Sequence, residues 1–190
     1  MIERRVSEFL GVNKKGSKRW FSELAFCILT ANYSAERGIR IQREIGECFF
    51  ICSKEELARE LRRLGHRFPK ARANYIVLAR RYAVNLKEIL SSQRNTFNMR
   101  EWLVSNVKGI GYKEASHFLR NVGFFDVAIL DYHILDLLES YSIIKRTKTL
   151  TRRRYFDIEN TVRELASLVG LEPGVLDLYL WYMETGKVLK

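Results

Sequence analysis

Two glycines, Gly109 and Gly111, constrain the fold of this 190-residue chain more than any other feature of its sequence. They interrupt the helical pattern around Trp102, and a second helical pattern begins directly after them at Tyr112. A tight turn between two helices needs positive φ angles or absent side chains, and glycine satisfies both conditions. The sequence therefore predicts a hairpin between two helices, over about residues 105–120.

The predicted hairpin has the chemistry of a phosphate site. A helix that begins after Gly111 presents unpaired backbone N–H groups at its N-terminus, and the helix dipole adds positive charge there. Both features favour an anion such as a phosphate. Lys108 lies in the turn, and Lys113 lies in the first turn of the following helix. A lysine on a helix is usually a solvated charge, so it is the position after the hairpin that favours a functional role for Lys113.

An aspartate follows 18 residues after this lysine. Asp131 comes directly after the apolar residues 127–130 and before the helical pattern of Ile134, Leu135 and Leu138. This is the position of an N-cap, where a carboxylate accepts hydrogen bonds from the first backbone amides and stays ionised.

Helical periodicity dominates the rest of the chain, and strand patterning is nearly absent. We therefore predict an all-α fold of nine or ten helices. Further predicted helices include residues 20–29, residues 41–50, a helix after the N-cap Ser53 that ends at Gly65, a helix that begins at Pro69, about residues 157–169, and residues 173–185 with Gly186 as the stop signal.

Charge and cysteine content narrow the class of protein. The formal net charge of +11 indicates a polyanionic partner, although a merely soluble basic protein is the alternative. Cys27 falls in an apolar helical pattern, and Cys48 and Cys52 have no Cys or His partners at zinc spacing. These features predict a reduced, cytoplasmic protein without a metal site. No apolar stretch is long enough for a membrane helix.

The hairpin, Lys113 in the next helix, and Asp131 followed two residues later by His133 resemble the helix-hairpin-helix DNA glycosylase superfamily. The lysine is similar to that of its bifunctional members. The short chain and its terminal lysine resemble the archaeal-type 8-oxoguanine DNA glycosylase/AP lyase family. The resemblance implies one domain over residues 1–190, with two helical lobes and an active cleft between them. It also implies a monomer that acts on double-stranded DNA containing 8-oxoguanine, in the cytoplasm of a prokaryotic cell, where the nucleoid lies.

The resemblance assigns the chemistry to two residues. A neutral Lys113 amine would attack C1′ of the damaged nucleotide, expel the base and leave a Schiff base, after which β-elimination cuts the strand. An ionised Asp131 would stabilise the positive charge that develops on the sugar or assist proton transfer involving Lys113, alongside its role as an N-cap.

Other expected site residues follow from the resemblance, each beside a structural alternative. Asn32 would fill the space of the flipped nucleotide, or simply end a helix. His133 would contact a phosphate, or be a polar residue of the first helical turn. Phe68 and Trp181 would sandwich the extruded purine, although aromatic residues on helices are normally core. Lys190 and the chain end would recognise 8-oxoguanine, although a terminal lysine is usually frayed.

No cofactor is expected. The iron–sulfur cluster of endonuclease III-like relatives needs four cysteines near the C-terminus, whereas all three cysteines here precede residue 53. By resemblance, the carbonyls of Ser105, Val107 and Ile110 would hold a monovalent cation. Two alternatives stay open at this point, namely a glycosylase/lyase for another oxidised base and a non-catalytic helix-hairpin-helix DNA-binding module.

Overall fold

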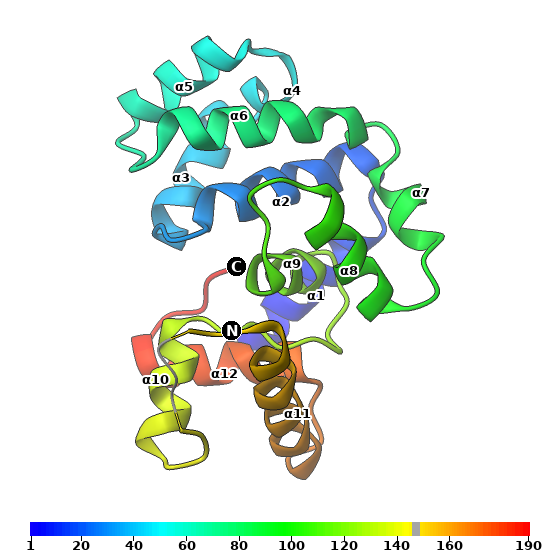
Figure 1. The fold of residues 1–190 in the computed structure, drawn as a ribbon, viewed down its shortest axis with the longest axis vertical. Helices are drawn as coiled ribbons and strands as arrows, with labels where there is room; N and C mark the ends of the chain where they lie inside the picture. Colours follow the sequence, from blue (N-terminus) through cyan, green and yellow to red (C-terminus); the bar gives the residue numbers. More distant parts are fainter. Residues whose placement is uncertain (146–148) are drawn as a thin grey trace.

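The computed structural model describes residues 1–145 and 149–190, and these residues form helices joined by short loops, without a strand (Figure 1). The all-α prediction is confirmed. The number of helices was underestimated, because the described residues form twelve α-helices and one short 3₁₀ turn, η1. In chain order these are α1 (Ile2–Asn13), α2 (Ser17–Thr30), α3 (Ala35–Ile45), α4 (Cys48–Ile51), α5 (Lys54–Arg63), α6 (Pro69–Ala79), η1 (Arg80–Tyr82), α7 (Leu86–Ser91), α8 (Thr96–Asn106), α9 (Tyr112–Asn121), α10 (Tyr132–Ser140), α11 (Arg152–Leu168) and α12 (Pro173–Thr185).

Several predicted boundaries are confirmed by the capping groups that cause them. Ser53 forms a full capping box with Glu56 at the start of α5. Gly65, with φ of 77°, follows the end of this helix, and Gly186 ends α12 in the left-handed conformation. Pro69 begins α6 as expected.

Other boundaries were wrong for local reasons. The helix predicted over residues 41–50 is two helices, α3 and α4, separated at Gly46. Helix α11 begins five residues earlier than expected, because the Thr151 side chain accepts a hydrogen bond from the Arg154 N–H and caps it there. The N-terminal helix α1 was not predicted at all.

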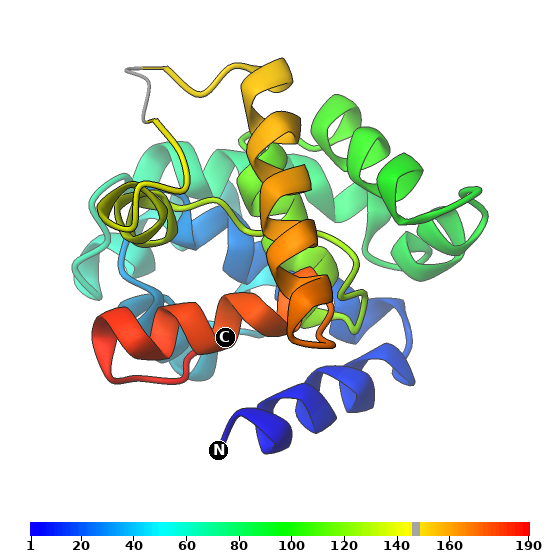
Figure 2. The same ribbon diagram turned by 90° about the horizontal axis from the view of Figure 1, so that it is seen from below.

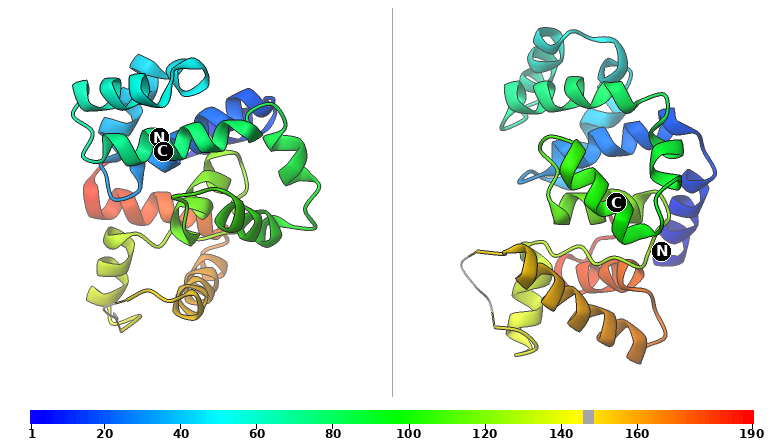
Figure 3. Two further views of the ribbon diagram at one scale, coloured as in Figure 1. Left: turned by 45° about the horizontal axis from the view of Figure 1, so that its top comes forward. Right: turned by 45° about the vertical axis from the view of Figure 1, so that its right-hand side comes forward.

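The helices form two lobes with separate hydrophobic cores. Most buried side chains of α2, α3, α5, α6, α8 and α9 pack together around α2. A second core joins α10, α11 and α12, beginning at Ala128 in the segment that precedes α10. Figure 1 shows α5 and α6 at one end of the molecule, α10 and α11 at the other, and α9 between them. The same division is visible in both views of Figure 3.

The N-terminal helix packs against the C-terminal lobe. Phe9 of α1, Phe125 and Leu178 of α12 form a small third core. Figure 2 shows α1 beside α12, with the two chain ends on the same side. No helix among the described residues has the length and apolar character needed to cross a membrane.

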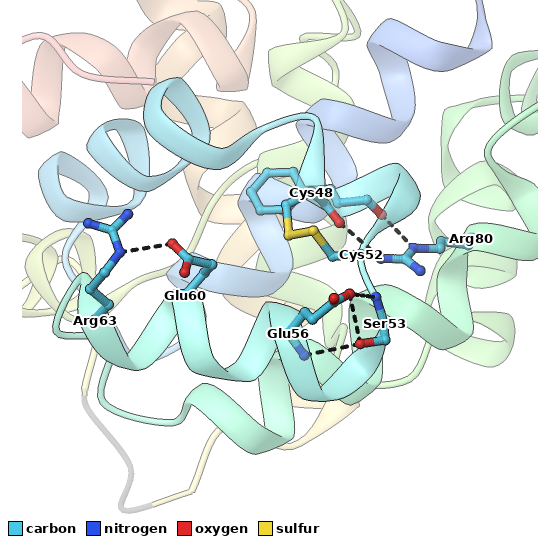
Figure 4. The surroundings of a disulfide bond; sticks show 8 residues. Cys48, Cys52, Ser53, Glu56, Glu60, Arg63 and Arg80 are labelled. Carbon is cyan, nitrogen blue, oxygen red and sulfur yellow. Dashed lines mark hydrogen bonds and ion pairs between the residues drawn. A yellow bond between two sulfur atoms is a disulfide. The ribbon is translucent and has the colours of Figure 1, made fainter.

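One prediction about the cysteines was wrong. Cys48 and Cys52 form a disulfide across the single turn of α4 (Figure 4). Cys27 is free and buried, as expected. Two residues four positions apart on a helix lie on the same face, so their side chains can meet. The prediction of a reduced protein did not take this spacing of Cys48 and Cys52 into account. Arg80 holds the same turn by donating to the carbonyls of Cys48 and Phe49 at 2.9 and 2.7 Å.

Candidate active site

A cleft of about 1200 Å³ lies between the two lobes. Its walls come from the turn after α2, from α9, from the segment around Asp131, from α12 and from the chain end. Six of the predicted site residues line it, namely Asn32, Lys113, Asp131, His133, Trp181 and Lys190. Residues spread over almost the whole sequence therefore meet on one concave surface.

Lys113 enters the cleft from the first turn of α9. Its side chain is 23% exposed, and its Nζ lies 3.8 Å from Glu114 Oε1. A distance of 3.8 Å is too long for a direct hydrogen bond, so this neighbouring carboxylate does not hold the amine tightly. The amine is therefore accessible from the cleft, and its side chain extends from the first turn of α9.

Asp131 caps α10 as predicted. Its Oδ1 accepts a hydrogen bond from the Ile134 N–H at 3.0 Å. This bond uses one carboxylate oxygen and fixes the side chain at the positive end of the helix dipole. Asp131 is half-buried and lines the same cleft as Lys113.

The hairpin forms as predicted, but its two glycines differ. Gly109 has a φ of 87°, and a Cβ there would lie only 2.3 Å from the Tyr75 ring. Gly111 is extended, with φ of −105°, and a Cβ would meet only Glu114 Oε2 at 3.4 Å. The prediction that both turn positions require glycine is therefore confirmed for Gly109. It is wrong for Gly111 in the protein without DNA.

The hairpin leaves backbone groups at the surface. Gly111 is the N-cap of α9 and provides no side-chain cap, as expected for an anion site. Lys108 is exposed in the turn, outside the lining of the cleft. The Val107 carbonyl accepts a hydrogen bond from the Ile110 N–H at 3.3 Å. Cation binding by the carbonyls of this turn stays a prediction.

Asn32 lies in a strained turn that the α5–α6 connection supports. It is exposed and has a φ of 55°, the left-handed conformation that asparagine tolerates better than most residues. Arg72 donates to the Ala31 carbonyl, and His66 Nε2 lies 3.0 Å from the Leu29 carbonyl oxygen. These contacts hold the turn so that Asn32 points away from the core.

Phe68 does not line the cleft. It lies at the N-cap of α6, where the Arg67 and Arg72 guanidinium groups sit 5.0 and 5.7 Å from its ring. Its N–H donates to His66 Nδ1 at 3.0 Å. The same histidine therefore contacts both the Asn32 turn and the start of α6, while a role of Phe68 in a base pocket stays a prediction.

Trp181 and His133 contact each other in the lining of the cleft. Their ring centroids are 4.6 Å apart in an edge-to-face arrangement with an interplanar angle of 83°. This contact joins α12 to the first turn of α10. Trp181 is half-buried and lines the same cleft as Asp131.

Lys190 is held in place and is not frayed. Its Nζ donates to Glu23 Oε1 and Oε2 at 2.9 and 3.1 Å and also bonds the Gln42 side chain. The ammonium lies 4.4 Å from the Phe26 ring centroid. Burial lowers the pKa of Lys190, and the attraction of Glu23 opposes this change. The last residue of the chain is therefore fixed against the first lobe.

Two polar features of the cleft were not found from the sequence. Arg120 and Asp177 form a buried ion pair at 2.7 Å that joins α9 to α12. Burial raises the pKa of the Asp177 carboxyl to about 7, and the nearby Asp131 acts in the same direction. The sequence signal that could have indicated this pair is Asp177, a charged residue within the apolar start of α12, one helical turn before Trp181.

His117 is the second such feature. It lies one turn after Lys113 on α9, is only 6% exposed, and neither ring nitrogen has a hydrogen-bond partner among residues 1–145 and 149–190. Burial, together with the charges of Arg120 and Lys113, lowers its pKa well below the usual range. A neutral imidazole is therefore present in the wall of the cleft.

The described part of the chain contains no cluster of three or more His, Cys, Asp or Glu side chains that could hold a metal ion. The arrangement instead combines an accessible amine, a capped carboxylate and an aromatic face in one cleft. Such a set can perform nucleophilic substitution at an electrophilic carbon, with charge stabilisation by the carboxylate.

Known proteins are similar to this chain in sequence and in fold. The family described as 8-oxoguanine DNA glycosylase matches residues 2–171. The 8-oxoguanine DNA glycosylase/AP lyases of Methanocaldococcus jannaschii and Korarchaeum cryptofilum are 56% and 54% identical, over all of this chain and 92% and 90% of those proteins.

Solved structures agree with these relatives. The Methanocaldococcus jannaschii 8-oxoguanine glycosylase/lyase, crystallised with a 15mer DNA containing 8-oxoguanine, has a TM-score of 0.97 and 55% identity, covering 100% of this chain and 91% of that one. The 8-oxoguanine DNA glycosylase of Thermotoga maritima has a TM-score of 0.94 and 46% identity, again covering 100% and 91%.

Proposed function

Because this chain belongs to the 8-oxoguanine DNA glycosylase family, we propose that it excises 8-oxoguanine from double-stranded DNA and then cleaves the strand. The observation that carries the proposal is the meeting of Lys113 and Asp131 in one cleft beside the hairpin. Two proteins named for both activities are 56% and 54% identical to this chain over its whole length, which supports the glycosylase and the lyase steps. The DNA substrate would place the working enzyme on the nucleoid of a prokaryotic cell.

In this proposal the Lys113 amine attacks C1′ of the extruded nucleotide. The C1′–N9 bond breaks, and the base leaves with its electron pair and takes up a proton. The sugar ring opens to give an imine between Lys113 and C1′. This imine acidifies the C2′ proton, whose loss breaks the C3′–O bond, and water then releases the lysine.

Asp131 has an electrostatic role in the same step. Positive charge builds up on the sugar as the C1′–N9 bond breaks, and a fixed carboxylate stabilises it. The hydrogen bond from the Ile134 N–H orients this carboxylate before the substrate arrives. Little reorganisation is then required during the reaction.

Residues of the cleft and of its surroundings bind the substrate. The hairpin amides and Lys108 contact the DNA backbone, His133 contacts a phosphate near the lesion, and Asn32 enters the duplex. Trp181 stacks on the extruded purine, with Phe68 as the second aromatic residue after a shift toward the cleft. The anchored chain end supplies the contacts that distinguish 8-oxoguanine from guanine, which differ only at C8 and N7.

Lys113→Gln tests the proposal. This variant should lose excision by on the order of a thousand-fold or more and form no borohydride-trapped adduct, while it still binds damaged duplex. Lys108→Gln is the matched control, because this lysine lies in the hairpin but not in the cleft lining, and it should retain the adduct. An adduct that persists in Lys113→Gln would place the nucleophile elsewhere.

A substrate panel then separates the lesion classes. Duplexes with 8-oxoguanine, an oxidised pyrimidine or a preformed abasic site distinguish the proposed activity from excision of another oxidised base. Retained binding without any trapped adduct in the wild type would instead favour a non-catalytic DNA-binding module.

A further inference from the structure

A fully buried cluster of polar side chains lies outside the lining of the cleft. It consists of Arg100 of α8, Ser116 of α9, and Tyr155 and Glu159 of α11, which are at most 2% exposed. Buried charges are destabilising unless they are paired and hydrogen-bonded, so the contacts of this cluster require an explanation.

The charged pair connects three helices. Arg100 donates from Nη1 to Glu159 Oε1 at 2.5 Å and from Nη2 to Glu159 Oε2 at 2.8 Å. Nη1 also lies 3.1 Å from Ser116 Oγ. Since α8 and α9 are the two helices of the hairpin, these hydrogen bonds of Arg100 fix both helices to α11.

The same cluster clamps one peptide unit of the segment before α10. The Ala128 N–H donates to Glu159 Oε1 at 2.9 Å, and the Tyr155 hydroxyl donates to the Ala128 carbonyl at 2.7 Å. Burial raises the pKa of the Tyr155 hydroxyl, so this group keeps its proton. The hydroxyl shares a further hydrogen bond with Ser116 Oγ at 3.1 Å.

The positions of the clamped groups in the sequence connect this cluster to the chemistry. Ala128 precedes Asp131 by three residues, and Ser116 follows Lys113 by three residues, which is about one helical turn. The Tyr155 hydroxyl therefore touches both the segment that carries Asp131 and the helix that carries Lys113. Residues 127–130 belong to no helix, so their placement depends on such contacts.

We propose that Tyr155 is a positioning residue that sets the place of Asp131 relative to Lys113. The inference rests on the proposed roles of these two residues. Reacting groups must be held to within a fraction of an ångström, and a displacement of about 1 Å costs up to about a hundred-fold in rate. One hydroxyl group that bridges the two segments is well placed to provide this accuracy.

Tyr155→Phe tests the inference, because it removes the hydroxyl and keeps the ring. We expect single-turnover excision of 8-oxoguanine to fall about ten-fold, while affinity for the damaged duplex changes less than about three-fold. Hydrogen exchange should increase in residues 127–134 and stay unchanged in α5 and α6. Unchanged exchange in residues 127–134 would overturn the inference.

Ile158→Val is the matched control for a general loss of stability. Ile158 lies beside these residues on α11 and is 3% exposed in the same core, but it contributes no side-chain hydrogen bond. This variant should lower the unfolding temperature and leave the excision rate within about two-fold. Equal rate losses in Tyr155→Phe and Ile158→Val would assign Tyr155 a purely structural role.

A double variant identifies the residue through which Tyr155 acts. If Tyr155 works through Asp131, adding Tyr155→Phe to Asp131→Asn should cost less than about two-fold further. A full ten-fold loss in both backgrounds would contradict this pathway. Normal excision by Asp131→Asn would instead refute the proposed function of Asp131, which is a separate failure.

Discussion

The anchoring of Lys190 leads to a prediction with two graded changes. The side-chain ammonium of Lys190 is bound to Glu23. Lys190→Ala removes the ammonium and keeps the backbone at position 190. Deletion of residues 188–190 removes this anchor together with Leu189, which also lines the cleft.

The magnitude follows from the surroundings of Glu23. This carboxylate is 1% exposed, so the loss of Lys190 leaves a buried charge with one partner fewer. Arg19 Nη2 remains at 2.9 Å from Glu23 Oε1, which limits the loss of stability to about 1–3 kcal/mol. Loss of this anchor lets the segment with Leu189 and Lys190, which lines the cleft, change its position.

Recognition should suffer more than strand cleavage. A pocket that selects 8-oxoguanine must contact N7–H or O8, because stacking on Trp181 is similar for both purines. We expect roughly a ten- to hundred-fold loss of 8-oxoguanine excision for the deletion, and a smaller loss for Lys190→Ala. In the proposed mechanism, cleavage at a preformed abasic site needs Lys113 and no base pocket, so it should stay within about three-fold of the wild type.

The assay compares single-turnover rates of each variant on both substrates. Glu184→Ala is the matched control, since Glu184 is exposed near the end of α12 and lies outside the cleft lining. It should leave both rates unchanged. Equal losses on both substrates would indicate general destabilisation, and no loss on either would remove the chain end from the recognition site.

Gly109→Ala should distort the hairpin, because a Cβ there would clash with Tyr75, and should therefore lower the unfolding temperature and weaken binding to damaged and undamaged duplex alike. Gly111→Ala should leave the unfolding temperature of the free protein unchanged, because a Cβ at this position meets no such contact. Equal unfolding temperatures for the two variants would contradict this difference. Burial raises the pKa of Asp177 to about 7, so the folded protein holds a proton that the unfolded chain releases from about pH 4 upward. Stability should therefore fall as the pH rises through this window, and Asp177→Asn should flatten the dependence of the unfolding midpoint on pH; an unaltered slope would refute the assignment.

Local signals in the sequence determined the hairpin, the caps and the ends of several helices. Gly109 adopts the positive φ that a tight turn requires, Ser53 and Asp131 cap helices through hydrogen bonds within three residues, and Gly186 stops α12. These features depend on neighbouring residues only, so one sequence contains the information needed to predict them. The boundary at Gly46 was missed, because apolar residues continue on both sides of it.

The contacts between residues far apart in the sequence depend on how the helices pack. Lys190 pairs with Glu23 across almost the whole chain, Asp177 with Arg120, and Tyr155 bridges Ala128 and Ser116. Each contact depends on how two helices pack, and the periodicity of one helix contains no information about its partner. Local sequence signals were therefore enough to predict the proposed reacting groups, whereas the packing of the two lobes forms the cleft that both of them line and the buried contacts around it.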